Sequence, residues 1–220
     1  MNTLNFDYYY LGQSIGKYQV PLDIFDSINH IYETKFNKLN PANKQLIGKI
    51  KNEHSLFFRG EDESMMNQHN HLPFDILKWY EVCFNQYLSR NHITDYSLHL
   101  NSIWVNQMRE HEYNPVHVHQ GSLYTGLSSV MILKLPPHGY GVEYSAADQP
   151  QNGKLQILGA TNGQFAKIDY QQETKERDFY IFPYDMRHWV YPFNGTDETR
   201  RTLAANCDVQ FDPTANRGLA

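Results

Sequence analysis

The 220-residue sequence predicts a mainly β fold, a sandwich or jelly roll, with N-terminal helices packed on the outer face of one sheet. In the first third of the chain, apolar residues recur with helical spacing. After Asn91 they instead fall in many short segments with the period of a strand. Turn signals separate these segments, among them Asn-Gly pairs at 152–153 and 194–195. Many short strands with frequent turns are typical of all-β domains rather than of parallel α/β sheets.

Two helices are expected in the N-terminal part. Over residues 22–39 the apolar side chains share one helical stripe, with Pro21 suited to the first turn and Pro41 just past the end. A second stripe predicts a helix over residues 73–89, and a short strand is expected near 55–59. We therefore expect residues 1–95 to form a helical extension that packs on a β body of residues 96–220, within one structural domain.

The β body is expected to hold strands at residues 96–100, 103–108, 115–119, 127–135, 154–158, 179–182, 188–191 and 200–209.

Composition excludes several classes of function. The net charge is −5 and no stretch concentrates lysine and arginine, so nucleic-acid binding is not expected. Two cysteines, Cys83 and Cys207, are too few for a secreted disulfide framework, which favours a reducing, cytoplasmic setting. The first residues lack the basic and apolar regions of a signal peptide, and no apolar run approaches the roughly 20 residues that span a membrane.

Three histidines are candidate metal ligands. His117 and His119 stand two apart on an expected strand, so both imidazoles would point to one face. Such a pair alone is more often two ordinary histidines on a half-buried strand. His188 lies in an apolar and aromatic segment, residues 182–192, and a buried imidazole needs a partner, which a metal ion can provide.

Arg200 is a candidate anchor for a carboxylate. It follows His188 by 12 residues, at the start of the next expected strand, and its planar guanidinium can bind a carboxylate through two hydrogen bonds. Thr202 would share its face. Arg201 competes for the same role, but strand alternation places the two arginines on opposite faces, so only one can point inward. A surface ion pair is the alternative for either arginine.

Aromatic and amide side chains could shape a pocket near these residues. The candidates are Trp104, Asn106, Tyr113, Tyr124 and Trp189, each of which taken singly is more often packing than chemistry.

The order of these motifs resembles a known family. The chain reads Asn114-Pro115-Val116-His117-Val118-His119, then Thr125-Gly126 and a strand ending at Pro136. Gly153-Lys154-Leu155, Phe182-Pro183 and His188-Trp189-Val190-Tyr191-Pro192 follow, and Arg200 stands six residues before Asn206. Over about 104–206 this set resembles the iron(II)/2-oxoglutarate-dependent oxygenases, in particular a branch common in marine phages and bacteria. A phage-encoded protein acting in the host cytoplasm is one implication.

The resemblance implies a double-stranded β-helix that binds iron(II), 2-oxoglutarate and dioxygen. The metal would be held by His117, His119 and His188, with His119 where the superfamily usually has a carboxylate. A second option makes His119 the first ligand and places Gly121 at the carboxylate position, which leaves an open coordination site. The far carboxylate of 2-oxoglutarate would pair with Arg200, assisted by Thr202, Tyr124 or Asn106.

The implied function is a dioxygenase, a hydroxylase of unidentified substrate that decarboxylates 2-oxoglutarate to succinate. Two alternatives stay open at the level of sequence. One is a three-histidine dioxygenase of the cupin type that does not use 2-oxoglutarate. The other is a non-catalytic jelly-roll module that binds a ligand or forms part of a virion.

Overall fold

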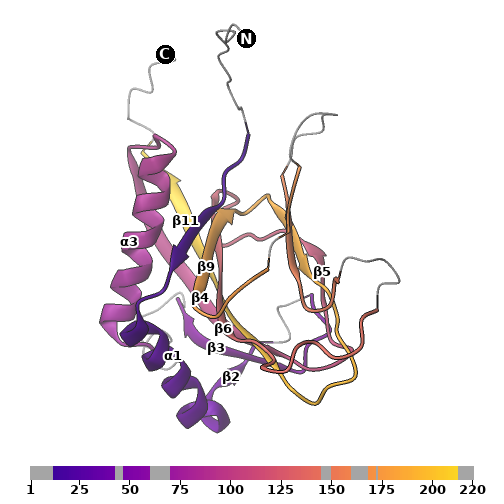
Figure 1. Ribbon diagram of the computed structural model, residues 1–220. Coiled ribbons are helices and arrows are strands. Elements are labelled where there is room, and N and C mark those ends of the chain that lie inside the picture. The colour runs from indigo at the N-terminus through magenta and orange to yellow at the C-terminus, as the bar shows by residue number, and fades with distance from the viewer. Residues whose placement is uncertain are drawn as a thin grey trace, which may run out of the picture.

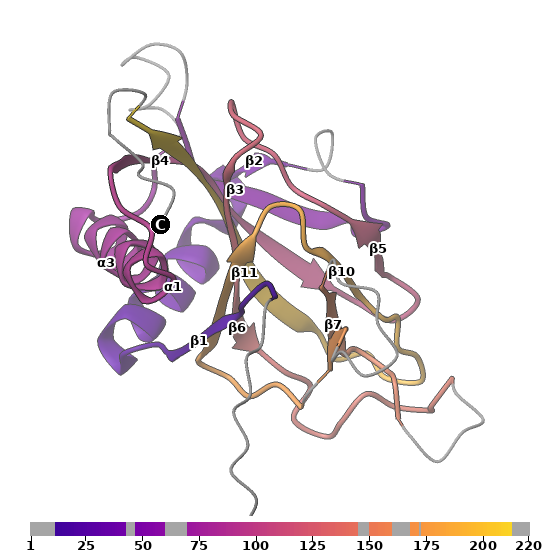
Figure 2. The ribbon, with the colours of Figure 1, turned by 90° about the horizontal axis from the view of Figure 1, so that it is seen from above.

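The computed structural model describes residues 12–42, 47–59, 70–144, 150–159, 168–171 and 173–212. Two antiparallel sheets face each other, and two helices, α1 (Leu22–Lys35) and α3 (Phe74–Arg90), cover the outer face of the larger sheet (Figures 1 and 2). This arrangement confirms the mainly β jelly roll with helices on one sheet. No helix among the described residues is long and apolar enough to cross a membrane.

The larger sheet has seven strands. Their order across the sheet is β1 (Gly16–Gln19), β9 (Asp178–Pro183), β6 (Gly126–Lys134), β11 (Arg200–Phe211), β4 (Tyr96–Met108), β3 (Asn52–Phe58) and β2 (Asn40–Pro41).

The smaller sheet has four strands. Their order is β5 (Asn114–His117), β10 (Arg187–Val190), β7 (Leu155–Leu158) and β8 (Asp169–Gln171).

The helices form because their apolar residues fall on one stripe. In α1 the buried residues are Ile24, Ile28, Ile31 and Tyr32, a spacing of three and four that places them against the sheet. Pro21 precedes the first turn, where its missing N–H leaves no hydrogen bond unmade. A 3₁₀ turn, Phe36–Lys38, continues the chain past α1.

The two faces of the larger sheet belong to two separate apolar cores. Strand β6 shows this, since eight of its nine residues are buried. Met131 and Leu133 join the core under the helices, whereas Val130 and Ile132 join the core between the sheets. A strand covered on both faces tends to be apolar without alternation, and β6 has that character from Val130 to Leu133.

The N-terminal part contributes more strand than expected. Besides its helices it supplies β1, β2 and β3, which extend the larger sheet at both edges. Residues 96–108 form one continuous strand rather than two. β1, β2 and β8 have only four, two and three residues, too short for a periodic signal. Residues 1–11, on which the expected absence of a signal peptide depends, lie outside the described residues.

Candidate metal centre

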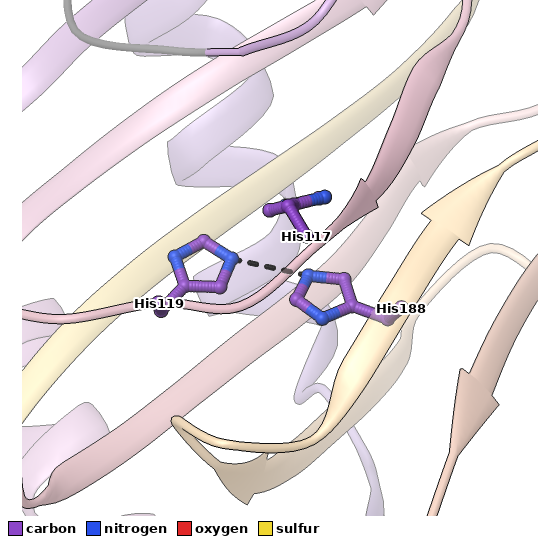
Figure 3. A group of neighbouring side chains, drawn as sticks. All are labelled: His117, His119 and His188. Atoms are coloured by element: carbon purple, nitrogen blue, oxygen red, sulfur yellow. Dashed lines mark hydrogen bonds between the residues drawn. The ribbon is translucent and has the colours of Figure 1, made fainter.

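Two paired strands and the segment after one of them position three histidines. His117 ends β5, and its Cα pairs with that of His188 on β10. His119 lies two residues beyond the end of β5, where its backbone N–H donates to the Tyr184 carbonyl at 3.0 Å. The three side chains point toward one another, as Figure 3 shows.

The three imidazoles are close enough to share one metal ion. One ring nitrogen from each residue lies within 4.8 Å of the others, and the Nε2 atoms of His119 and His188 are 3.1 Å apart. Ring centroids are separated by 4.2 Å for His117 and His188, 4.9 Å for His119 and His188, and 5.0 Å for His117 and His119. In the part of the chain that the structure describes, no other group of three His, Cys, Asp or Glu residues converges in this way.

Backbone carbonyls orient two of the rings. Nδ1 of His117 lies 2.6 Å from the Pro115 carbonyl oxygen, and Nδ1 of His188 lies 3.1 Å from that of Met186. A carbonyl oxygen can only accept, so each Nδ1 carries the proton and donates it. The Nε2 lone pairs are then left for a metal, an arrangement typical of histidine ligands.

Burial keeps the three imidazoles neutral. Loss of solvent lowers the pKa of His188 to about 3, with a further contribution from His117. Burial likewise lowers the pKa of His117 and, together with the neighbouring histidines, holds the pKa of His119 well below its usual range. Neutral imidazole is the form that binds a metal.

The histidines open into a cavity of about 220 Å³ between the two sheets. Apolar side chains from three strands line part of it: Val130, Leu155 and Val190.

Some of the residues predicted to line the site reach this cavity and others do not. Trp104, Asn106 and Thr202 line it. Tyr113 and Trp189 are not among the lining residues. Tyr124 also lies outside the cavity, with 88% of its surface exposed.

Arg200 is buried in the interior between the sheets. It is fully shielded from solvent, and among the described residues its Nε and Nη2 atoms have no hydrogen-bond partner. Burial lowers its pKa, an effect opposed by the nearby hydroxyls of Tyr140 and Tyr180. A buried guanidinium with unused donors is suited to an anionic ligand.

Arg201 lies on the opposite face of β11, as strand alternation predicts. Its guanidinium donates to Gln107 at 3.0 Å, to Asn29 at 3.1 Å and to Glu33 at 3.2 Å, and it lies 4.5 Å from the ring centre of Tyr32. Because these contacts hold it against helix α1, Arg201 is not directed at the cavity.

Gly121 is poorly placed for the second ligand option. A side chain at this position would collide with Asp208 and Asn101, so the Cα faces those residues. His117, which that option leaves out, lies among the three converging rings.

A charged cavity residue was missed by sequence reasoning. Glu53 is on β3, lines the cavity and is only 1% exposed. The expected strand began at Ser55, so nothing in the sequence placed this carboxylate beside the histidines. A buried acid on a strand is unusual, and it becomes a signal only once the register of β3 is known.

Comparison with known proteins finds a family match over part of the chain. Residues 102–206 match the model of a family described as "Putative 2OG-Fe(II) oxygenase", a span that contains all three histidines and Arg200. No curated protein sequence matches the chain.

Solved structures of low identity share the fold. A Pseudomonas putida prolyl-4-hydroxylase has 16% identity and a TM-score of 0.53, covering 89% of this chain and 91% of its own. A Burkholderia pseudomallei oxidoreductase of the 2OG-Fe(II) oxygenase family has 12% identity and a TM-score of 0.52, with 88% and 84% covered. A Trichoplax adhaerens prolyl hydroxylase, solved with a hypoxia inducible factor peptide fragment, has 11% identity and a TM-score of 0.52, with 91% and 84% covered.

The family match favours an enzyme over a non-catalytic jelly-roll module. Over residues 102–206, just under half of the chain, the protein is therefore similar to the iron(II)/2-oxoglutarate-dependent oxygenases, oxidoreductases that use iron(II), 2-oxoglutarate and dioxygen, and it shares the fold of solved members.

Proposed function

We propose that this protein is an iron(II)/2-oxoglutarate-dependent oxygenase, a hydroxylase that holds iron(II) through His117, His119 and His188 and anchors 2-oxoglutarate through Arg200. The observation that carries the proposal is the convergence of three neutral imidazoles at a cavity between the sheets, together with a guanidinium with unused donors that is buried in the same interior. The cation site and the anion site are thus both built from side chains of the same interior.

A set of three histidines differs in charge from the usual set of two histidines and a carboxylate. With three neutral ligands the metal keeps its full double charge, which strengthens its attraction for an anionic co-substrate. Imidazole suits iron(II), so the substitution at His119 is compatible with the metal. The backbone contacts of His117 and His188 engage their Nδ1 atoms and would leave the Nε2 atoms to hold the ion.

The co-substrate would lie along the inner face of β11. Arg200, Thr202 and Ala204 alternate inward on this strand, and the last two line the cavity. The guanidinium would bind the far carboxylate of 2-oxoglutarate, and the Thr202 hydroxyl and the Asn106 amide could each add a hydrogen bond. We leave Tyr124 out of this set because of its exposure.

When bound, iron(II) with 2-oxoglutarate and dioxygen supplies the oxidation of a substrate C–H bond to an alcohol, with 2-oxoglutarate converted to succinate and carbon dioxide. The chain itself orients these groups and excludes water. Val130, Leu155 and Val190 provide an apolar wall that limits access of solvent to the reacting atoms.

An anaerobic titration tests the metal site and the co-substrate site together. Addition of iron(II) and then 2-oxoglutarate to the wild-type protein is expected to give a charge-transfer absorption band in the visible region, and air is expected to yield succinate. His188→Ala is expected to lose both. Succinate formation at the wild-type rate in that variant would refute the ligand assignment.

The same measurement separates the proposal from the cupin-type alternative, which the three-histidine set also suits. A dioxygenase of that type would bind the metal without requiring Arg200 and would form no succinate.

A further inference from the structure

A buried carboxylate forms part of the wall of the metal cavity. Glu53 on β3 pairs with Asn106 on β4, and Asn106 pairs in turn with Thr202 on β11. Residues paired across neighbouring strands project to the same face of a sheet. All three line the cavity beside the histidines, so they form a polar row across the inner face of the larger sheet.

One oxygen of the carboxylate in this row has no donor among the described residues. Among the described residues, neither Oε2 of Glu53 nor Oδ1 of Asn106 has a hydrogen-bond partner. The nearest charge acting on Glu53 is another carboxylate, Glu112, whose oxygens already accept from the backbone N–H groups of Lys51 and Arg109 at 3.1 and 2.9 Å. Burial and Glu112 together raise the pKa of Glu53 to about 7.

Packing alone does not account for a carboxylate at this position. A buried acid without a donor lowers stability, and an apolar side chain of similar size would avoid that penalty. No lysine or arginine is among the described residues that line the cavity, so none of these residues neutralises Glu53. The missing donor is therefore expected from a ligand in the cavity.

The co-substrate is not that ligand. 2-Oxoglutarate carries two negative charges and would be repelled by an ionised Glu53. A group with a positive charge and several N–H donors fits, since it can donate to Glu53 Oε2 and to Asn106 Oδ1 at once.

We propose that Glu53 binds a protonated amine or guanidinium group of the substrate and so orients the substrate beside the metal. The proposal rests on the proposed function, because it takes the cavity beside the histidines as the place where the substrate is oxidised.

Small cations test the proposal without knowledge of the substrate. n-Butylguanidinium and n-butylammonium, with butyramide as the neutral control, are titrated by calorimetry into anaerobic protein loaded with iron(II) and 2-oxoglutarate. Both cations are expected to bind the wild type and to bind Glu53→Gln roughly tenfold or more weakly. Butyramide is expected to bind the two proteins alike. Glu81→Gln removes the same charge from the exposed side of α3 and is expected to keep wild-type affinities.

Three outcomes overturn the inference. The first is that the cations do not bind the wild type. The second is that Glu53→Gln binds the cations as tightly as the wild type does. The third is that Glu53→Gln loses affinity for butyramide by the same factor as for the cations. Glu53→Asp keeps the charge on a shorter side chain and is expected to prefer the cations to butyramide. Lack of any preference in that variant contradicts the inference even if Glu53→Gln does not fold.

The absorption band of the iron and 2-oxoglutarate complex, recorded in the same samples, separates this inference from the proposed function. Absence of the band in the wild type contradicts the proposed function. A normal band without cation binding that depends on Glu53 contradicts only the inference about the substrate.

Discussion

Glu53→Gln is expected to stabilise the metal-free protein, and more so as the pH rises. The side chain is 1% exposed, and its pKa is raised from 4.5 to about 7. The sign follows from proton binding. Between these two values the folded state holds a proton that the unfolded state has lost, so stability falls as the pH rises through this window. Glutamine keeps the shape of glutamic acid but has no proton to lose.

The magnitude follows from the same two pKa values. At ~1.36 kcal/mol per pH unit, the full penalty of ionising Glu53 in the folded state is about 3 kcal/mol. The free energy of unfolding of the variant should therefore exceed that of the wild type by about 1 kcal/mol at pH 5 and by about 3 kcal/mol at pH 8. For a chain of this size the larger value corresponds to roughly 6–12 °C in Tm.

Urea unfolding of both proteins at pH 5, 6, 7 and 8, without metal, measures this difference. Histidine protonation affects both proteins equally and is removed by subtraction. Glu81→Gln, which loses an exposed carboxylate paired with Lys78 at 3.0 Å, is the control and should change stability little at any pH. If the gain in unfolding free energy of Glu53→Gln over the wild type is constant with pH, or shrinks toward pH 8, the reasoning is refuted.

Three further results are expected. Arg200→Ala should raise the 2-oxoglutarate concentration needed for half-maximal succinate formation roughly tenfold or more. Arg201→Ala should raise it much less, because only Arg200 lies between the sheets. The reverse ranking would mean that Arg200 is not the anchor. Gly126→Ala should lower the free energy of unfolding in urea by about 1–3 kcal/mol, because a Cβ there would collide with the Tyr184 ring. Zinc replaces the oxidisable iron in a calorimetric titration, and its affinity should fall only below pH 6.5. The reason is that the pKa of His188 is lowered to about 3, and protons compete with the metal only near such lowered values. A loss of zinc affinity with a midpoint above pH 6.5 contradicts this.

Local periodicity predicted where several of the candidate site residues lie. Alternation on β11 correctly separated Arg200 from Arg201, because the strand is long and regular there. The two-residue spacing of His117 and His119 predicted that both rings share a face, and they do meet. The reason differs in part, since β5 ends at His117 and a hydrogen bond to the Tyr184 carbonyl holds His119 in place.

Features that depend on long-range register could not be read from the sequence. Glu53 reaches the cavity because β3 pairs with β4, and that pairing carries no local signal. Tyr124 was expected among the aromatic residues that shape the pocket, but it precedes β6 and lies on the surface. The cytoplasmic and phage settings stay predictions, since they do not depend on the fold.

The placement of His119 outside any strand has a mechanical consequence. His117 and His188 belong to one sheet ladder, whereas His119 begins the crossing from β5 to β6 over residues 118–125. An ion held by all three rings would link that connection to the smaller sheet. Loading and removal of the metal would then tighten and loosen one rim of the cavity, so the entrance for the substrate would be shaped by the same ion that serves the chemistry.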